Sequence, residues 1–505
     1  MADTSAEAAR QPLPRNWAPL ATVPQAHLPR RLASPARALG VLGLACLVGA
    51  AIPLVPTGML LVGLAACLLI TAVVFRPAIG AYVLFGATPL IAGIDRGLAI
   101  PVLRPNEALF ALIGTGLLIR GVVRTASGSA PTLTLNAIDV PFLLLAFTSS
   151  VLPLAWMLIR GQGIAQDDLL YALIVWKYYG IYLVMRNSIR TERAARTCLW
   201  MAMISASVVA VIGVLQSLQL FGVAHILSTY YAPYGSGQAL LNNRGGSTLS
   251  LPIAVADLMT FNLAIAVGLL IARRGNRAVL VAMSTLFVVA VIAAGEFSGV
   301  IGLVLGLAVL ALVTRRVDRI AAFIPVFVPA AFALRPVIER RLQGFSSASG
   351  LPMSWAGRLR NLHSYFWPKL FSDGNFILGV RPAARVSAPS MATGYIWIES
   401  GYTWLLWGGG IPLLLAFLYF LRAGLRRHLP LARSRQDAVG ASALAVVVAL
   451  VVVGVLMVLD SHLTYRGSAD LLFSLMGIIV GVTDQERADA ADGRLSDEQS
   501  SNPEG

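Results

Sequence analysis

Residues 439–459 read VGASALAVVVALVVVGVLMVL and include no charged side chain. A helix of this length can cross the ~30 Å hydrocarbon core of a bilayer. Comparable apolar runs recur between residues 38 and 482. Because a backbone in lipid has to satisfy its own hydrogen bonds, we expect these runs to be helices rather than open strands. The sequence therefore predicts an all-α, polytopic integral membrane protein.

The apolar runs predict about 12–14 transmembrane helices. We expect them near residues 38–55, 57–75, 78–94, 106–120, 140–158, 169–186, 197–217, 251–272, 278–294, 299–314, 320–334, 402–421, 439–459 and 469–482. Residues 38–482 would then form a single transmembrane domain. The polar tail at 1–37 and the acidic, Ser- and Gly-containing segment 483–505 are expected to be disordered cytoplasmic tails.

Arginine residues gather in alternate connections between these helices. After Arg30, Arg31 and Arg37 they are Arg76, Arg120, Arg124, Arg186, Arg190, Arg193, Arg196, Arg273, Arg274, Arg277, Arg315, Arg316, Arg319, Arg422, Arg426, Arg427, Arg433 and Arg435. Basic residues accumulate in short loops on the cytoplasmic side of a membrane. This pattern predicts that both tails are cytoplasmic and that the long loops 218–250 and 335–401 lie on the outer face.

The outer loop 335–401 is rich in arginine, although basic residues are normally scarce on that side. Its basic residues are Arg335, Arg340, Arg341, Arg358, Arg360, Lys369, Arg381 and Arg385, against Glu339, Asp373 and Glu399. Arginine offers a planar fork of donors that suits phosphate oxygens. Residues 354–371 have the pattern of an amphipathic helix with interfacial aromatics. The loop therefore predicts an anionic ligand, either a lipid-linked pyrophosphate sugar or an anionic lipid surface.

The first long outer loop ends with a single strong charge, Arg244, followed by Gly245 and Gly246. The next helix is expected to begin near Leu251. An arginine beside a helix start, where backbone N–H groups are free, is a plausible cradle for an anion. An ordinary glycine turn with an arginine that reaches toward the interface is the other interpretation.

Three ionisable residues lie within or between apolar runs. An intramembrane charge costs roughly 2.5–3.5 kcal/mol on insertion scales, so Lys177 and Asp257 each need a partner or a wet cavity. They either pair for structural reasons or mark a substrate path. We expect Glu296 to lie in a solvated turn between two helices.

Several classes of function lack sequence support. The five histidines are scattered without metal-ligand spacing, and there is no phosphate-binding loop or dinucleotide fingerprint. The cysteines Cys46, Cys67 and Cys198 lie in or at the edge of apolar runs and do not suggest a disulfide or a metal site. The sequence predicts no metal, no cofactor and no nucleic-acid partner.

Several short motifs occur in a consistent order between residues 170 and 482. They are Gly213-Val-Leu-Gln216, Asn243-Arg-Gly-Gly-Ser-Thr248, Trp355-Ala-Gly-Arg358, Phe376-Ile-Leu-Gly-Val380 and Tyr395-Ile-Trp-Ile-Glu-Ser-Gly401. Together with the large outer loop late in the chain, they resemble the O-antigen polymerase and O-antigen ligase superfamily of bacterial envelope polysaccharide enzymes.

This resemblance implies a metal-independent glycosyltransferase of GT-C type in the bacterial cytoplasmic membrane. The donor would be a glycan on polyprenyl pyrophosphate, and a flippase and a chain-length regulator of the same pathway would be partners. Arg244, Arg358, Arg360 and Arg381 would bind the pyrophosphate. The general base would be Glu399 or His363, and the residues leave both open.

Three functions remain open at this stage. Ligases of the superfamily have a histidine just before the Tyr395 motif, but residues 388–394 read APSMATG, which favours a polymerase over a ligase. A flippase or transporter of lipid-linked sugars is the third possibility. It would need a charged path toward the cytoplasmic face, for which Lys177 is the deep central charge.

Overall fold

The computed structural model describes residues 57–97, 100, 103–128, 135–231, 240–317, 324–343, 352–388 and 394–500. The expected tail at 1–37, the expected helix at 38–55 and residues 501–505 lie outside them. The chain from Ala66 onward forms one compact unit, and the described part of the first unit is the beginning of α2. The described cavities are lined by residues of the unit that starts at Ala66.

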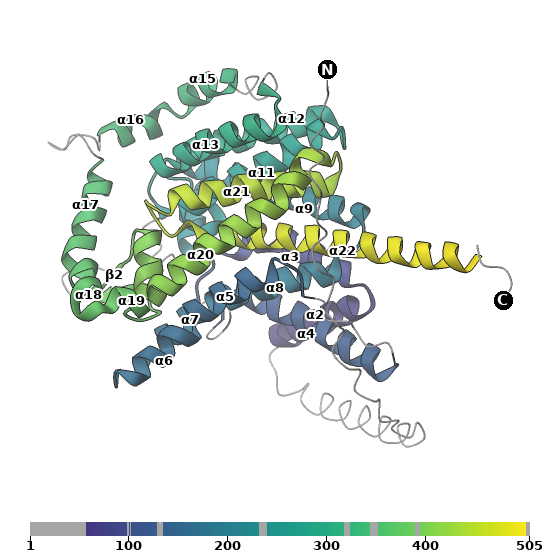
Figure 1. Cartoon of the computed structure of the whole chain (residues 1–505). Coiled ribbons are helices and arrows are strands. Elements are labelled where there is room, and N and C mark those ends of the chain that lie inside the picture. Colours follow the sequence, from purple (N-terminus) through teal and green to yellow (C-terminus); the bar gives the residue numbers. More distant parts are fainter. Residues whose placement is uncertain are drawn as a thin grey trace, which may run out of the picture. The chain divides into compact units, whose positions relative to one another are not determined.

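The described chain is almost entirely helical (Figure 1). Its α-helices are α2 (Thr57–Phe75), α3 (Pro77–Ile91), α4 (Pro105–Ala126), α5 (Asp139–Ser149), α6 (Val151–Ile159), α7 (Gln166–Ala172), α8 (Ile174–Ser188), α9 (Glu192–Ser217), α10 (Val223–Tyr230), α11 (Pro252–Ile271), α12 (Arg277–Ala294), α13 (Phe297–Thr314), α15 (Ile324–Ala333), α16 (Arg335–Gln343), α17 (Met353–Asn361), α18 (Trp367–Phe371), α19 (Asn375–Leu378), α20 (Gly401–Ser434), α21 (Ala438–Leu456) and α22 (Ser468–Ser500). Short elements are η4 (Ser247–Leu249), η5 (Leu362–Phe366), η6 (Ser372–Gly374), η7 (His462–Thr464), β1 (Arg385–Ser387) and β2 (Tyr395–Trp397).

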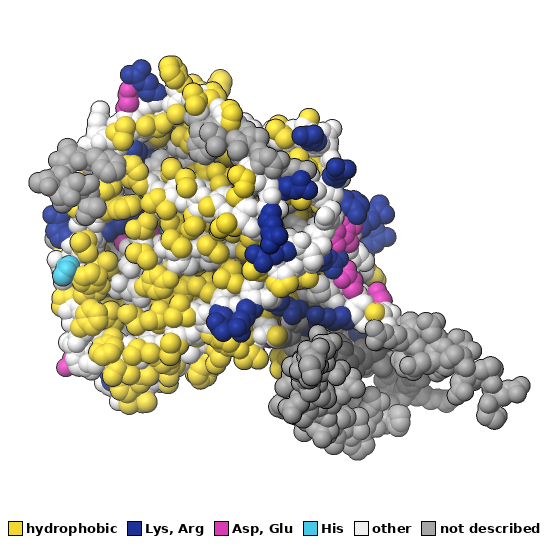
Figure 2. Space-filling view, turned by 45° about the horizontal axis from the view of Figure 1, so that its top comes forward, with side chains coloured by type: hydrophobic (Ala, Val, Ile, Leu, Met, Phe, Trp, Pro, Cys, Tyr) yellow, Lys and Arg dark blue, Asp and Glu magenta, His cyan; other side chains and the backbone are white. Residues whose placement is uncertain are grey.

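The described residues contain 10 helical stretches that are long and apolar enough to cross a membrane. Two shorter apolar helices, Leu61–Phe75 and Pro77–Ile91, add to them. Hydrophobic side chains cover most of the face in Figure 2, and Lys and Arg gather mainly toward one border. The prediction of an all-α, multi-pass membrane protein is confirmed.

Two adjacent helices at the centre of the bundle are α11 and α21. In their most apolar stretches, 94% and 83% of the residues are buried inside the protein, as are 89% in that of α22, whereas the corresponding value for α4 is 11%. Small residues allow the two backbones to approach closely, as transmembrane helix contacts require. A Cβ atom at Gly268 would lie 2.8 Å from the Cα atom of Ala441. These two helices are therefore surrounded by protein, and α4 faces largely outward.

Two helices, α8 and α22, run side by side in the same direction and are joined by an ion pair at each end of their contact. Near the N-termini of both helices, Lys177 Nζ lies 3.6 Å from Asp470 Oδ1. Near the C-terminus of α8, Arg186 Nη2 lies 2.9 Å from Asp484 Oδ2, in the middle of α22. The pairing of Lys177 answers one question left by the sequence, because its charge is compensated by a neighbouring helix. Polar residues of the two long loops gather at the Lys177 end.

Several boundaries differ from the sequence-based expectation. The run 140–158 is divided at Ser150, whose hydroxyl donates to the Ala146 carbonyl oxygen at 2.6 Å. The run expected at 320–334 is described as the 10-residue helix α15, which is too short to span a bilayer. α20 continues past residue 421 to Ser434, in a segment rich in Leu, Arg and Ala, which favour helices.

The expected disorder after residue 483 also differs from the structure, because α22 is helical as far as Ser500. The acidic residues at its start have partners on other helices. Asp484 pairs with Arg186, and Glu486 pairs with Arg435 at 2.7 Å. Residues such as Gln, Glu, Arg and Ala also favour a helix once it has begun. Composition alone did not reveal these contacts.

The loop before α20 folds into short helices and a hairpin. The expected amphipathic segment 354–371 is helical in α17, the π-helical turn η5 and α18. Strands β1 and β2 then form an antiparallel pair, with Arg385 opposite Trp397, which the sequence did not predict. Each strand has only three residues, and so short a segment leaves little alternating pattern to read.

The orientation expected from the arginine pattern can be tested with single cysteines. In a variant whose native cysteines are replaced by alanine, Ser364→Cys and Ser434→Cys provide two exposed thiols. We expect a membrane-impermeant maleimide to label Ser364→Cys on intact cells and to label Ser434→Cys only after permeabilisation. The opposite labelling pattern would reverse the orientation.

Candidate functional site

A cavity of ≈ 590 Å³ lies where the two long loops meet the ends of the helices. It is lined by Tyr171, Asn242, Arg244, Ser250, Leu251, Pro252, Ile253, Glu296, Arg358, Asn361, Ala384, Tyr395, Ile396, Trp397, Ile398, Glu399, Trp404, Asp460, Ser461 and Tyr465. The structure thus brings together Arg244, Arg358 and Glu399, three of the residues expected to bind pyrophosphate or to act as the base. We call this space the headgroup cavity.

Arg358 organises one side of the headgroup cavity. It lies at the C-terminal end of α17, where its Nη1 atom is 3.2 Å from Asp460 Oδ2 and donates to the Leu459 carbonyl oxygen at 3.1 Å. Its Nε atom is 3.6 Å from Glu399 Oε1. A single guanidinium therefore connects α17, the segment just before α20 and the turn after α21.

Glu399 is placed to exchange a proton. Desolvation raises the pKa of its carboxyl group, the charge of Arg358 opposes this, and Asp460 raises the pKa further. A weak hydrogen bond from Asn361 Nδ2, at 3.5 Å, opposes the rise. Catalytic bases near neutral pH are commonly carboxylates shifted in this direction.

Arg244 and Arg341 share one carboxylate on the other side of the cavity. Glu296 pairs with Arg244 through one oxygen and with Arg341 Nη2 through the other, at 2.9 Å. Glu296 is only 8% exposed, so the expectation that it lies in a solvated turn is wrong. Two arginines from distant segments converge on it, and this convergence could not be read from the turn sequence. Desolvation lowers the pKa of Arg341, and the nearby charge of Arg358 adds to the effect.

The segment that carries Arg244 is held tightly against α9. A Cβ atom at Gly245 would lie 2.9 Å from the Gly213 carbonyl oxygen, so the close approach requires glycine. Ser247 has a left-handed backbone with φ 48°, and its N–H donates to the Gln216 side chain at 2.7 Å. This strained turn is buried, which fixes the backbone beside Arg244. The motifs at residues 213–216 and 243–248 are therefore direct neighbours.

Asp257 supports the turn that carries Asp460. Its carboxylate lies 2.8 Å from Nδ1 of His462, and both side chains are almost completely buried. The N–H of His462 in turn donates to the carbonyl oxygen of Asp460 at 2.9 Å. Asp257 is thus paired within the protein, and we assign it a positioning role behind the cavity.

A second cavity, of ≈ 780 Å³, shares a wall with the first. Five residues line both cavities: Tyr171, Leu251, Tyr395, Trp397 and Tyr465. Lys177 lines the second cavity together with Arg104, Arg466 and Asp167. Desolvation lowers the pKa of Arg104 to about 10, with repulsion from Arg466 and then Arg96 adding to the effect.

Three of the residues expected to bind pyrophosphate or to act as the base lie outside the headgroup cavity. His363 is exposed and rests edge-on against Trp367, with ring centroids 4.5 Å apart. Arg360 is also exposed, on the same helix as Arg358. Arg381 is committed to Asp168, a fully buried carboxylate, through Nε at 2.9 Å, and this pairing raises the pKa of the arginine.

Residues that no sequence motif singled out complete the site. Asp460, Asn361 and Arg341 contact the selected residues, and each comes from a segment distant from its partner. Asp460 had one usable signal, since it is an acidic residue directly after a long apolar run. Arg341 was visible only as one of many arginines in the loop.

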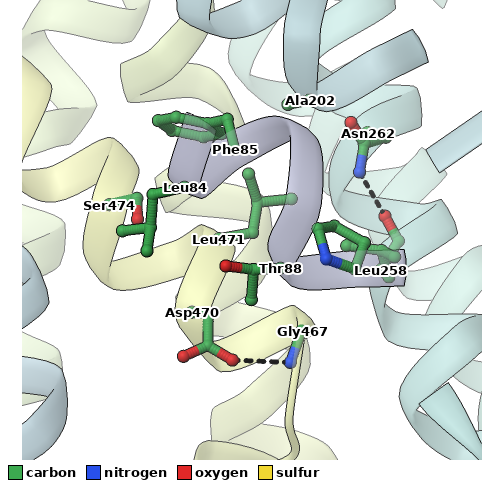
Figure 3. Close-up of a pocket in the computed structure, with 11 residues that line it drawn as sticks. Leu84, Phe85, Thr88, Ala202, Leu258, Asn262, Gly467, Asp470, Leu471 and Ser474 are labelled. Atoms are coloured by element: carbon green, nitrogen blue, oxygen red, sulfur yellow. Dashed lines mark hydrogen bonds between the residues drawn. The ribbon is translucent and has the colours of Figure 1, made fainter. Parts of the chain in front are cut away.

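The core contains a much smaller cavity of ≈ 20 Å³, between α3, α11 and α22 (Figure 3). Asp470 lies at its edge and accepts a hydrogen bond from the Gly467 N–H at 2.7 Å. This volume suits a single water molecule. It is a packing gap and not a ligand site.

Among the described residues, no three His, Cys, Asp or Glu side chains come together as a metal site would require. No protein-family model, curated protein or solved structure matches the chain.

The pairing of Arg381 with Asp168 predicts a structural role for both. Asp168→Asn should lower the free energy of unfolding by about 3 kcal/mol, at the low end for a broken buried pair because the Arg381 side chain is 31% exposed. Thermal unfolding of the detergent-solubilised protein measures this. The double variant Asp168→Leu, Arg381→Met should recover part of the loss. An unchanged melting temperature for Asp168→Asn would leave Arg381 free to act as a ligand.

Proposed function

We propose that the chain is a membrane glycosyltransferase that polymerises polyprenyl-pyrophosphate-linked oligosaccharide repeat units. Its setting would be the outer face of a bacterial cytoplasmic membrane, and its product an exopolysaccharide or O-antigen. The single observation that carries the proposal is the cavity in which Arg244 and Arg358 line the same space as the half-buried carboxyl group of Glu399. Two guanidinium groups suit a pyrophosphate, and the carboxylate suits a hydroxyl proton.

The reaction assigns one role to each group. An acceptor hydroxyl oxygen attacks the anomeric carbon of the donor sugar and forms the glycosidic bond. The bond between that carbon and the pyrophosphate oxygen breaks, and its electron pair leaves with the pyrophosphate beside Arg244 and Arg358. Glu399 accepts the hydroxyl proton. Positive groups aimed at the charge that develops on a leaving group are commonly the largest source of rate enhancement.

The position of the cavity favours an enzyme over a transporter. It lies at the Lys177 end of the bundle, and Lys177 itself is paired with Asp470. A transporter would need an open polar route to the Arg186 end, but the helices between are packed with apolar side chains, including Phe142, Tyr182 and Phe473. A flippase and a chain-length regulator would act as separate partners.

Purified protein tests this function directly. Given a polyprenyl-pyrophosphate oligosaccharide in detergent, it should produce longer lipid-linked glycans without nucleotide, ion gradient or divalent metal, so a chelator should leave the rate unchanged. Arg244→Ala and Arg358→Ala should each lower the rate by about 100-fold or more. Lysine at either position should restore only part of the activity, because it lacks the bidentate fork.

Arg360→Ala is the matched control, since Arg360 is on the same helix as Arg358 but is exposed and outside the cavity. It should keep near-normal activity. Normal polymer length from both cavity variants would reject the pyrophosphate site. Movement of lipid-linked sugar across sealed vesicles without elongation would reassign the chain as a flippase, and transfer to a different acceptor would reassign it as a ligase.

The pH dependence identifies the base. Glu399 has to be ionised to accept a proton, so the rate should rise as pH increases through its raised pKa. Asp460→Asn removes a like charge that raises this pKa, so the acidic limb of the rate profile should move to lower pH. Glu399→Gln should abolish the limb and lower the rate by about 100-fold or more. If His363→Ala abolishes the limb and Glu399→Gln does not, the histidine is the base.

A further inference from the structure

An apolar groove of ≈ 590 Å³ lies beside the headgroup cavity. Its walls come from Phe297, Val300 and Ile301 on α13, from Ile338 on α16 and from Trp355 on α17. Among the described residues that line it, the ionisable ones are Glu296 and Arg341. The groove is thus apolar along its length and charged at one place.

The charged residues of the groove lie where it meets the headgroup cavity. Glu296 lines both the headgroup cavity and the groove, and it pairs with Arg244 on the cavity side and with Arg341 on the groove side. The guanidinium of Arg341 also lies 5.2 Å from the centre of the Phe297 ring, at the start of α13. A ligand that crosses this junction would meet cationic groups first and an apolar surface next.

The helix that closes the groove is attached to the site. Val337 of α16 is buried against α12, and Arg340 of the same helix donates to the Asn243 side chain, next to Arg244, at 2.6 Å. The position of α16, and so of the groove, is therefore fixed relative to the segment that carries Arg244. A molecule bound in the groove would lie at a defined distance from the arginines.

We propose that this groove binds the isoprenoid chain of the donor lipid and that Arg341 is a third ligand of its pyrophosphate. This inference rests on the proposed function, because it takes the headgroup cavity as the pyrophosphate site. Continuity with that cavity and the placement of charge at the junction select an amphipathic ligand with an anionic head and a long apolar tail. Burial of the tail contributes affinity in proportion to the apolar area removed from water.

Binding of two probes separates the tail from the head. The full-length protein in nanodiscs is titrated with undecaprenyl pyrophosphate and with inorganic pyrophosphate. Val300→Trp and Ile338→Trp fill the groove from two different helices and should each weaken undecaprenyl pyrophosphate binding by about tenfold while leaving inorganic pyrophosphate binding unchanged. Arg341→Gln should weaken the binding of both probes.

Val304→Trp is the matched control. Val304 is one turn further along α13, is 58% exposed and lies outside the groove lining, so this variant should bind both probes normally. On the unmodified protein, an undecaprenyl pyrophosphate analogue with a photoreactive diazirine in its chain should cross-link to peptides from α13 and α16. This measurement does not depend on the folding of a variant.

The binding results separate the isoprenoid site in the groove from the pyrophosphate site in the headgroup cavity. Normal binding of undecaprenyl pyrophosphate by both groove variants, or cross-links to other helices, would show that the groove does not bind the isoprenoid chain. The proposed pyrophosphate site would be unaffected by that result. Displacement of the probe by an equal amount of phosphatidylglycerol would assign the groove to a phospholipid and also overturn the proposal. Failure of inorganic pyrophosphate to bind, with no effect of Arg358→Ala on the binding of undecaprenyl pyrophosphate, would instead reject the proposed function.

Discussion

A charge without a partner at the edge of the hydrocarbon layer is costly, and this cost organises the end of the bundle that carries the cavity. Lys177, Arg341 and Arg358 each lie beside at least one carboxylate from another element. The same constraint joins segments that are far apart in the sequence. The described residues of the loop before α20 therefore have a defined place on the bundle even though few of them belong to long helices.

Ion pairs between distant segments also hold the β1–β2 strand pair in place. Arg381 and Arg385, before and within β1, pair with Asp168 and Asp167 at the start of α7. The Ala383 N–H also donates to Asp168, and the Ala383 carbonyl oxygen accepts from Trp407 Nε1 at 3.0 Å. The strands thus form a fixed wall between the two cavities. Because Glu399 follows β2 by two residues, the pairing of these arginines positions the carboxylate without contacting it.

The sequence predicted what depends on local composition. Long apolar runs identified most of the helices, and the motifs around Arg244, Arg358 and Glu399 selected residues that do share a cavity. Contacts between distant segments could not be predicted. Glu296 was misread as solvated because its partners are 52 residues earlier and 45 residues later in the chain. The surroundings of Glu399 and His363 likewise could not be predicted, because the cavity around Glu399 is built from segments distant in the sequence.

The balance of charge in the headgroup cavity bears on how an anion would enter it. Among the described lining residues, two are arginines, Arg244 and Arg358, and three are acidic, Glu296, Glu399 and Asp460. The cavity is therefore not simply a basic surface that attracts lipid phosphates. A pyrophosphate would have to replace carboxylates as the partner of these arginines, and bidentate, charge-assisted bonds to phosphate oxygens make that exchange favourable. Once Arg358 turns to the phosphate, it no longer lowers the pKa of Glu399. Donor binding would then strengthen the base at the moment when an acceptor hydroxyl has to lose its proton.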